Sequence, residues 1–129
     1  MNISQAAKAA GLSAKQIRDY EKSGLLPPAP RSESGYRRYT AADLDRLRFI
    51  AHAREVGFSL AQTAELLRLS ADPHRTDCEV KALTAQHIAE ITGKIAALQT
   101  MLATLQNWHD ACAGGGSGEC GIVRGLEQA

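Results

Sequence analysis

Apolar residues recur every three or four positions along most of the chain, and this spacing predicts helices rather than strands. A first helix is expected from Ile3 to about Ala10, where Gly11 ends it. A second is expected from an N-cap at Ser13 to about Lys22. Two short helices joined by a tight turn that contains glycine are typical of a helix-turn-helix.

A stretch rich in proline and serine follows, from Leu25 to Tyr39. Its Ser34-Gly35 pair lies between two short runs of extended character, which predicts a small β-hairpin, or wing. The wing favours a DNA-binding role for the two helices that precede it.

Two more helices are expected beyond the wing. The third is capped by Thr40, with Asp43 at the carboxylate position of a capping box, and Gly57 ends it. The fourth begins at a Ser59 cap and runs to about Leu69. The buried side of the third helix should carry Leu44, Leu47, Phe49, Ile50 and Ala53.

From about Thr76 to His109 the chain has no proline and a single glycine, Gly93, which predicts one long helix. Its apolar residues alternate in steps of three and four, as in the seam of a coiled coil. These residues are Ile88, Ile91, Ile95, Leu98, Leu102 and Leu105. The rest of the chain is too short to bury an apolar stripe of this length. We therefore expect the stripe to pack against the same stripe of a second chain in a homodimer.

The predicted elements divide the chain into a winged helix-turn-helix DNA-binding domain at 1–70, a linker at 71–75, a dimerisation helix at 76–110, and a metal-binding loop with a short C-terminal helix at 111–129. The fold class is therefore all-α with a small β-hairpin wing. The last helix is expected around Ile122, Val123 and Leu126.

Charge is distributed unevenly, although the formal net charge is only +1. Basic residues gather between Lys15 and Arg54, and Lys15 and Arg18 project from one face near the start of the second helix. The N-terminal end of a recognition helix is the part that enters the major groove, so double-stranded DNA is the expected partner. The alternative is a solvated charged helix with tyrosines packed under a hairpin.

Several classes of protein are excluded by what the sequence lacks. No run approaches the roughly 18 to 20 apolar residues of a membrane span, and Met1 does not open a secretory signal, so we expect a cytoplasmic protein with no membrane partner. In that compartment the three cysteines are expected to be thiols or metal ligands. There is no phosphate loop and no catalytic Ser-His-Asp arrangement, so an enzyme is not expected.

Cys112 and Cys120 flank a glycine-rich span that can fold so that both thiolates meet one ion. Soft thiolates select Cu(I), Ag(I), Au(I), Zn(II), Cd(II), Hg(II) or Pb(II) over hard cations. The alternative is two unrelated thiols on a mobile tail. Two ligands alone suit linear Cu(I), because zinc normally takes four.

A dense set of short motifs identifies a family. The motifs are Met1-Asn2-Ile3-Ser4, Ala7-Lys8, Gly11-Leu12-Ser13, Ile17-Arg18, Tyr20-Glu21, Gly24-Leu25, Arg31, Gly35-Tyr36-Arg37, Tyr39, Phe49-Ile50, Ala53-Arg54 and Val56-Gly57-Phe58-Ser59. With the long helix, they closely resemble the MerR family of transcription regulators, most of all its copper-efflux branch. The resemblance runs over nearly the whole chain.

The resemblance implies a homodimer, joined by an antiparallel coiled coil, that sits on promoter DNA with RNA polymerase and activates metal efflux and detoxification genes by distorting the DNA. DNA contacts are then implied at Lys15, Arg18, Tyr20, Arg31, Tyr36, Arg37 and Arg54, and metal ligands at Cys112 and Cys120. One departure is Asp19, which lies where relatives usually carry an aromatic residue. A carboxylate beside phosphates is unfavourable, so Asp19 points away, caps a neighbour or reduces affinity.

Different residues of the chain point to different metals. The spacing of the cysteine pair and the N-terminal resemblance favour Cu(I), with Ag(I) or Au(I) as substitutes. Cys78, and Gly121 where copper sensors tend to have proline, resemble instead the sensors of Zn(II), Cd(II) and Pb(II), in which a third cysteine is a ligand. We expect Cu(I), with a divalent sensor as the alternative. Further candidate ligands are His74, Asp77, His109 and Glu119.

Two other classes remain open. A regulator of this kind can sense an oxidant or an organic ligand, with the cysteines forming a disulfide. A thiol-based metallochaperone is the other, and it would need no helix-turn-helix. Trp108 is expected to be a packing residue where the long helix meets the loop.

Overall fold

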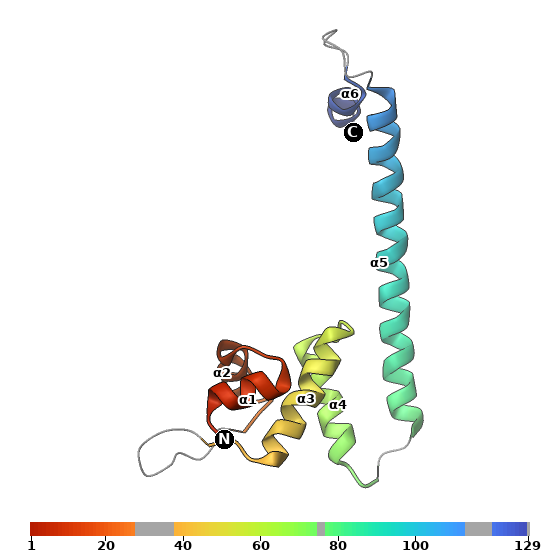
Figure 1. Cartoon of the computed structure of the whole chain (residues 1–129). Helices are drawn as coiled ribbons and strands as arrows, with labels where there is room; N and C mark the ends of the chain where they lie inside the picture. Colours follow the sequence, from red (N-terminus) through yellow and green to blue (C-terminus); the bar gives the residue numbers. More distant parts are fainter. Residues whose placement is uncertain (28–37, 75–76, 113–119, 129) are drawn as a thin grey trace. The chain divides into compact units, whose positions relative to one another are not determined.

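The computed structural model describes residues 1–27, 38–74, 77–112 and 120–128, and this part of the chain contains six helices and no strand (Figure 1). The helices are α1 (Ile3–Ala10), α2 (Ala14–Lys22), α3 (Ala41–Glu55), α4 (Leu60–Ala71), α5 (Asp77–Ala111) and α6 (Gly121–Gln128). All six were expected from the sequence, so the helical prediction is confirmed. The predicted wing falls mainly on residues 28–37, which lie outside the described residues. The chain divides into two compact units, Met1–Val80 and Lys81–Ala129.

Each of the helices α1 to α4 begins with a capping box, in which the cap side chain and the side chain three positions later each accept a hydrogen bond from the other's backbone N–H. In α3, for example, the Asp43 N–H donates to Thr40 Oγ1 at 3.2 Å and the Thr40 N–H donates to Asp43 Oδ2 at 2.9 Å. Such a cap stabilises a helix by about 1 kcal/mol. The predicted caps Ser13, Thr40 and Ser59 are confirmed, and a cap at Asn2 was not foreseen.

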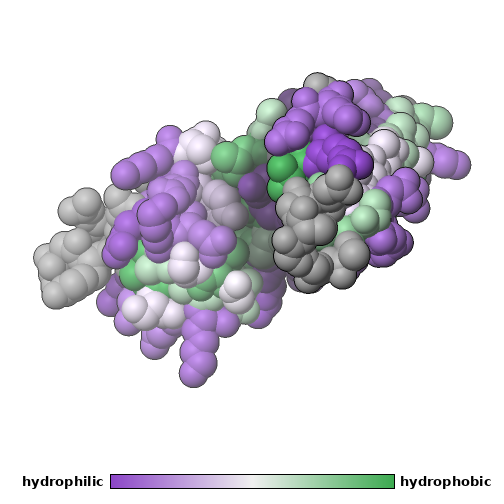
Figure 2. Space-filling view, turned by 90° about the horizontal axis from the view of Figure 1, so that it is seen from above, coloured by the Kyte–Doolittle hydropathy of each residue, from purple (hydrophilic) through white to green (hydrophobic). Residues whose placement is uncertain are grey.

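The core of the first unit forms where α1 packs against α2 and α3, and where α3 packs against α4. Its largest fully buried side chains come from α2, the segment after it, α3 and α4, and they are Ile17, Leu26, Leu47, Ile50 and Thr63. The face of this unit seen in Figure 2 carries largely hydrophilic side chains with apolar ones between them. The core therefore holds α2 from one side and leaves its other side to solvent.

The residues just before and just after 28–37 are anchored in this core. Leu26, which precedes this stretch, and Tyr39, which follows it, are both buried. The Tyr39 N–H donates to the Met1 carbonyl at 2.8 Å, and the Met1 ammonium donates to the Tyr39 carbonyl at 3.0 Å. The Tyr39 hydroxyl donates a short hydrogen bond to Glu21 Oε1 at the end of α2. The predicted wing thus begins and ends at points fixed to α2.

The second unit contains most of α5 and all of α6. At about 1.5 Å per residue, a helix of 35 residues is about 52 Å long. Its large apolar side chains remain exposed over several turns, namely Ile88, Ile95, Leu98, Met101, Leu102 and Leu105. The apolar stripe predicted from the sequence is therefore not covered within the chain.

Candidate metal site and DNA-binding surface

The exposed face of α2 carries the basic residues expected to read DNA. Lys15 and Arg18 are both exposed, while Ile17 on the opposite side is fully buried. Asp19 pairs with Lys15 one turn earlier, with Lys15 Nζ 3.1 Å from Asp19 Oδ2. The ion pair is open to solvent, so it contributes no more than a few tenths of a kcal/mol to folding stability. It therefore does not prevent Lys15 from reaching a phosphate. Asp19 therefore adds negative charge to the face that carries the two cations.

Two other predicted DNA contacts have a structural partner in the protein. The Tyr20 ring is buried in the core, so only its hydroxyl is a candidate for a phosphate contact. Arg54 is exposed, and its Nη1 donates to the Phe58 carbonyl at 2.7 Å just beyond α3. Arg31, Tyr36 and Arg37 lie outside the described residues. A DNA contact remains a prediction for all five residues.

The two cysteines of the predicted metal site lie side by side. Cys112 follows the last residue of α5, and its N–H donates to the His109 carbonyl at 3.1 Å. Cys120 directly precedes α6, and the Cys112 side chain lies close enough to the Cys120 sulfur for a hydrogen bond that lowers the pKa of Cys120. Both are half-buried, and both are free thiols. The structure thus brings together residues that are eight positions apart in the sequence.

The position of Cys120 at the start of α6 favours its thiolate. Backbone N–H groups of Val123 and Ile122 donate to the sulfur, and with the Cys112 thiol they lower the pKa of Cys120 below the ordinary value for cysteine, the Val123 hydrogen bond being the largest cause. The first N–H groups of a helix have no partner within it and carry partial positive charge, so they stabilise an anion placed there. Since the thiolate is the form that binds metals, the donor set fits a soft ion.

The other candidate ligands do not join this pair. Within the described residues, no group of three or more His, Cys, Asp or Glu side chains is arranged to hold a metal ion. Cys78 is exposed at the first turn of α5, about 50 Å along the helix from Cys112. A third ligand from Cys78 therefore has to come from a second chain. Glu119 lies outside the described residues.

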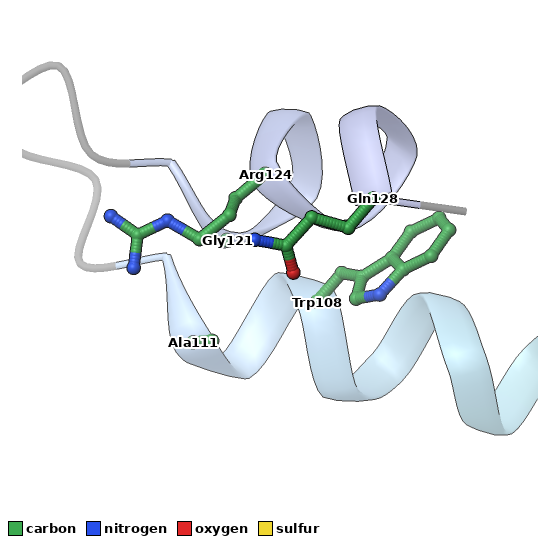
Figure 3. A pocket seen from close by; sticks show the side chains of 6 residues that line it. Trp108, Ala111, Gly121, Arg124 and Gln128 are labelled. Atoms are coloured by element: carbon green, nitrogen blue, oxygen red, sulfur yellow. The ribbon is translucent and has the colours of Figure 1, made fainter.

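Trp108 packs where α6 lies on the last turns of α5. A hollow of about 290 Å³ is lined by Trp108, Ala111, Gly121, Arg124, Gly125 and Gln128. Figure 3 shows the indole between the two helices, with Gln128 above it and the Arg124 side chain extending away from the ring. The expected packing role of Trp108 is in line with this contact.

The face that α6 turns toward α5 was not foreseen from the sequence. It is made of glycine and polar residues, while Val123 and Leu126 are exposed. The signal that could have found it is the spacing of Gly121 and Gly125, which places two residues without side chains on one face of a helix.

Comparison with protein families agrees with the helix-turn-helix predicted for the start of the chain. Residues 1–70 match the family described as MerR HTH family regulatory protein, and residues 44–108 match the one described as MerR, DNA binding. Both describe regulatory, DNA-binding proteins rather than enzymes. No helix among the described residues combines the length and the hydropathy needed to cross a membrane.

Similar proteins extend over almost the full length of the chain. A probable heavy metal-dependent transcriptional regulator of Haemophilus influenzae is 60% identical over 126 residues, which are 98% of each chain. The HTH-type transcriptional regulator CueR of Escherichia coli is 44% identical over 126 residues, 98% of this chain and 93% of the relative. A transcription regulator of Ralstonia metallidurans, solved in complex with lead(II), has a TM-score of 0.83 at 35% identity and is covered to 98%, as is this chain.

Proposed function

Because the chain belongs to the MerR family of helix-turn-helix regulators, we propose that it activates transcription in response to a soft metal ion, Cu(I) in particular. The observation that carries the proposal is the proximity of the Cys112 and Cys120 side chains, whose sulfurs are the two proposed ligands. Ag(I) and Au(I) share the preference of Cu(I) for thiolates and are expected to substitute for it.

The choice of Cu(I) rests on the number of ligands. The described part of the chain offers two adjacent thiols and no third His, Cys, Asp or Glu grouped with them. Two thiolates suit a monovalent ion that accepts linear coordination, whereas zinc is normally bound by four ligands. When bound, the ion would be held by Cys112 at the end of α5 and Cys120 at the start of α6. The chain's own contribution is to place Cys120, whose pKa is lowered by its hydrogen-bond partners, beside Cys112.

A divalent-metal sensor is the second candidate. The structural similarity to the regulator solved with lead(II) favours it, as does the presence of Cys78. Cys78 can reach the pair only from another copy of the chain, so this alternative requires a site built across a dimer. The two candidates therefore differ in whether Cys78 affects the metal response.

DNA binding is proposed for the exposed face of α2 and for the segment that follows it. Lys15 and Arg18 would contact DNA from the start of the recognition helix. Contacts from Tyr20, Arg31, Tyr36, Arg37 and Arg54 would fix the dimer on the phosphate backbone. The partners are promoter DNA and the RNA polymerase bound there.

A homodimer is proposed through α5. Large apolar side chains along an exposed helix are unfavourable in water, and a second α5 would cover them. Dimerisation also places two recognition helices on one pseudo-palindromic site. The region 71–75 then links the DNA-binding domain at 1–70 to the dimerisation helix at 76–110, and 111–129 senses the metal.

The proposed mechanism is a shift between two conformations of the DNA-bound dimer. A ligand shifts such an equilibrium only if it binds one conformation more tightly than the other. Here the ion would favour the conformation in which Cys112 and Cys120 meet, and the repacking of the region around Trp108 would pass this preference to the DNA-binding domain. The promoter DNA would then be distorted so that its elements align for polymerase.

The test is in vitro transcription from the cognate promoter under strict reduction, with buffered free Cu(I) and, separately, buffered Zn(II). We expect Cu(I) to activate the wild-type protein, Cys112→Ser and Cys120→Ser to abolish the response, and the matched control Cys78→Ser to leave it unchanged. Activation by Zn(II) that is lost in Cys78→Ser would favour the divalent sensor. A response in Cys112→Ser with unchanged metal dependence would contradict both. A response to oxidant that is lost under reduction would indicate a redox sensor.

A further inference from the structure

The helix α6 lies so close to α5 that two of its positions have no room for a side chain. A Cβ added at Gly121 would lie 2.7 Å from Ala111 Cβ and 2.8 Å from the Trp108 carbonyl oxygen. A Cβ added at Gly125 would overlap the indole of Trp108, where even Cδ1 would be only 2.6 Å away. Real Cβ atoms do not approach neighbours this closely, so either substitution has to move α6 or the ring.

Gly121 and Gly125 lie within the first five residues after Cys120, on one face of α6. Gly121 follows Cys120 directly, and Gly125 lies one turn further along the same helix face. The Arg124 N–H donates to the Cys120 carbonyl at 3.0 Å, so Cys120 is tied to the first turn of α6 and moves with it. Where α6 rests on Trp108 therefore decides where the Cys120 sulfur lies relative to Cys112.

We propose that Gly125 and Trp108 form a positioning contact for the metal site: the missing side chain at 125 lets α6 rest on the indole, and this places Cys120 beside Cys112. The proposal rests on the metal-binding function proposed above and assigns the contact a role in affinity. Neither residue touches the ion. Both act through the position of Cys120.

The alternative is that Gly125 serves only the stability of α6. Substitution by alanine separates the two roles, because alanine is the better helix former and a Gly→Ala change by itself favours the helix. A weaker metal site in Gly125→Ala thus cannot come from a lower intrinsic helix propensity of α6. It has to come from the collision with Trp108.

The size of the effect follows from the fraction of molecules in which α6 is docked. Apparent affinity falls in proportion to the fraction of the protein that is competent to bind. If overlap with the indole leaves one molecule in ten docked, the apparent dissociation constant for Cu(I) rises about tenfold, which corresponds to about 1.4 kcal/mol. We expect a rise of this size or more.

The chain provides a matched control in Gly93. It lies within α5, and a Cβ added there meets nothing within 4 Å. Gly93→Ala is therefore the same chemical change in a helix without the collision. We expect it to leave Cu(I) affinity within about twofold of the wild type.

The experiment measures the dissociation constant for Cu(I) of the full-length protein by competition with a Cu(I) chelator under reducing conditions. The variants are Gly125→Ala, Gly93→Ala, Trp108→Ala and the double variant of 108 and 125. Trp108 is the only tryptophan of the chain, so its fluorescence reports the contact independently of the metal. Gly125→Ala should shift the emission toward that of a solvated indole, and Gly93→Ala should not.

The expected result is weaker Cu(I) binding in Gly125→Ala and in Trp108→Ala, and no further loss when Gly125→Ala is added to Trp108→Ala, because the ring it collides with is then absent. Wild-type affinity in Gly125→Ala, or an equal loss with and without Trp108, would overturn the positioning role while leaving the proposed function intact. Failure of the wild-type protein to bind Cu(I) through Cys112 would overturn the proposed function, and the positioning role with it.

Discussion

Replacing Leu102 by alanine is expected to weaken the proposed homodimer by about two orders of magnitude. Leucine and alanine differ by three carbon groups, and each buried group contributes about 0.8 kcal/mol, so the change costs about 2.4 kcal/mol at a fully buried site. Within the single chain 64% of the Leu102 side chain is exposed, and this is the part that a partner can cover. The loss on dimerisation is therefore about 1.5 kcal/mol for each side chain.

The symmetry of the dimer doubles this loss. In a two-fold interface each substitution occurs twice, so Leu102→Ala removes about 3 kcal/mol from the free energy of association. Since about 1.4 kcal/mol corresponds to a factor of ten, the dissociation constant rises about 100-fold. Sedimentation velocity over a dilution series of the reduced, metal-free protein measures this constant directly.

A matched variant on the same helix makes the result specific. Thr100 is exposed and lies two positions earlier, which places it on the opposite face of α5 from Leu102. Thr100→Ala should leave the dissociation constant within about threefold of the wild type. If Leu102→Ala also changed it by less than threefold, the apolar stripe would not be the dimer interface.

Three further predictions concern the other parts of the molecule. Asp19→Asn removes an exposed carboxylate from the face of α2 that is proposed to bind DNA, and it is expected to tighten promoter binding about two- to fivefold at low salt, less at high salt, in a fluorescence anisotropy titration; weaker binding would mean that Asp19 has a favourable role. The lowered pKa of Cys120 keeps its thiolate at pH values where an ordinary cysteine is protonated and loses it only as pH falls through that lowered value. Cys112→Ala removes one of the donors, so the pH midpoint for alkylation of Cys120 should move upward, and an unchanged midpoint would contradict the hydrogen bond. Tyr39→Phe removes the buried hydrogen bond to Glu21 and should lower the free energy of unfolding by about 1–2 kcal/mol in urea titrations, whereas no change would show that the bond contributes nothing net.

The helices could be predicted from the sequence because their signals are local. Ser13, Thr40 and Ser59 accept hydrogen bonds from backbone N–H groups in the first turn that follows them. The start of each helix is therefore determined by four consecutive residues. The cap at Asn2 is equally local and was overlooked. Burial along α3 also followed from periodicity: of the five residues expected inside, Leu47, Ile50 and Ala53 are buried, and Leu44 and Phe49 are half-buried.

The candidate site was predictable only in part. The proposal that Cys112 and Cys120 are ligands followed from their spacing around a glycine-rich span and from a family resemblance. The capping of the Cys120 sulfur by backbone N–H groups of α6 did not follow, because it depends on where that helix begins and on how it is placed. Asp19 was recognised as an anomaly, but its pairing with Lys15 needed side-chain positions.

The sequence by itself determined the helices, most of their caps, the apolar stripe of α5 and the types of residue available for DNA and metal. These depend on interactions between residues a few positions apart, which a one-dimensional pattern records. Only the tertiary structure decided that Tyr20 is part of the core, that the two sulfurs lie close together, and that α6 turns Gly121 and Gly125 rather than Val123 and Leu126 toward α5. The direction in which a short helix turns is set by the shape of the surface it meets, here the indole of Trp108, and no periodicity in the chain encodes that shape.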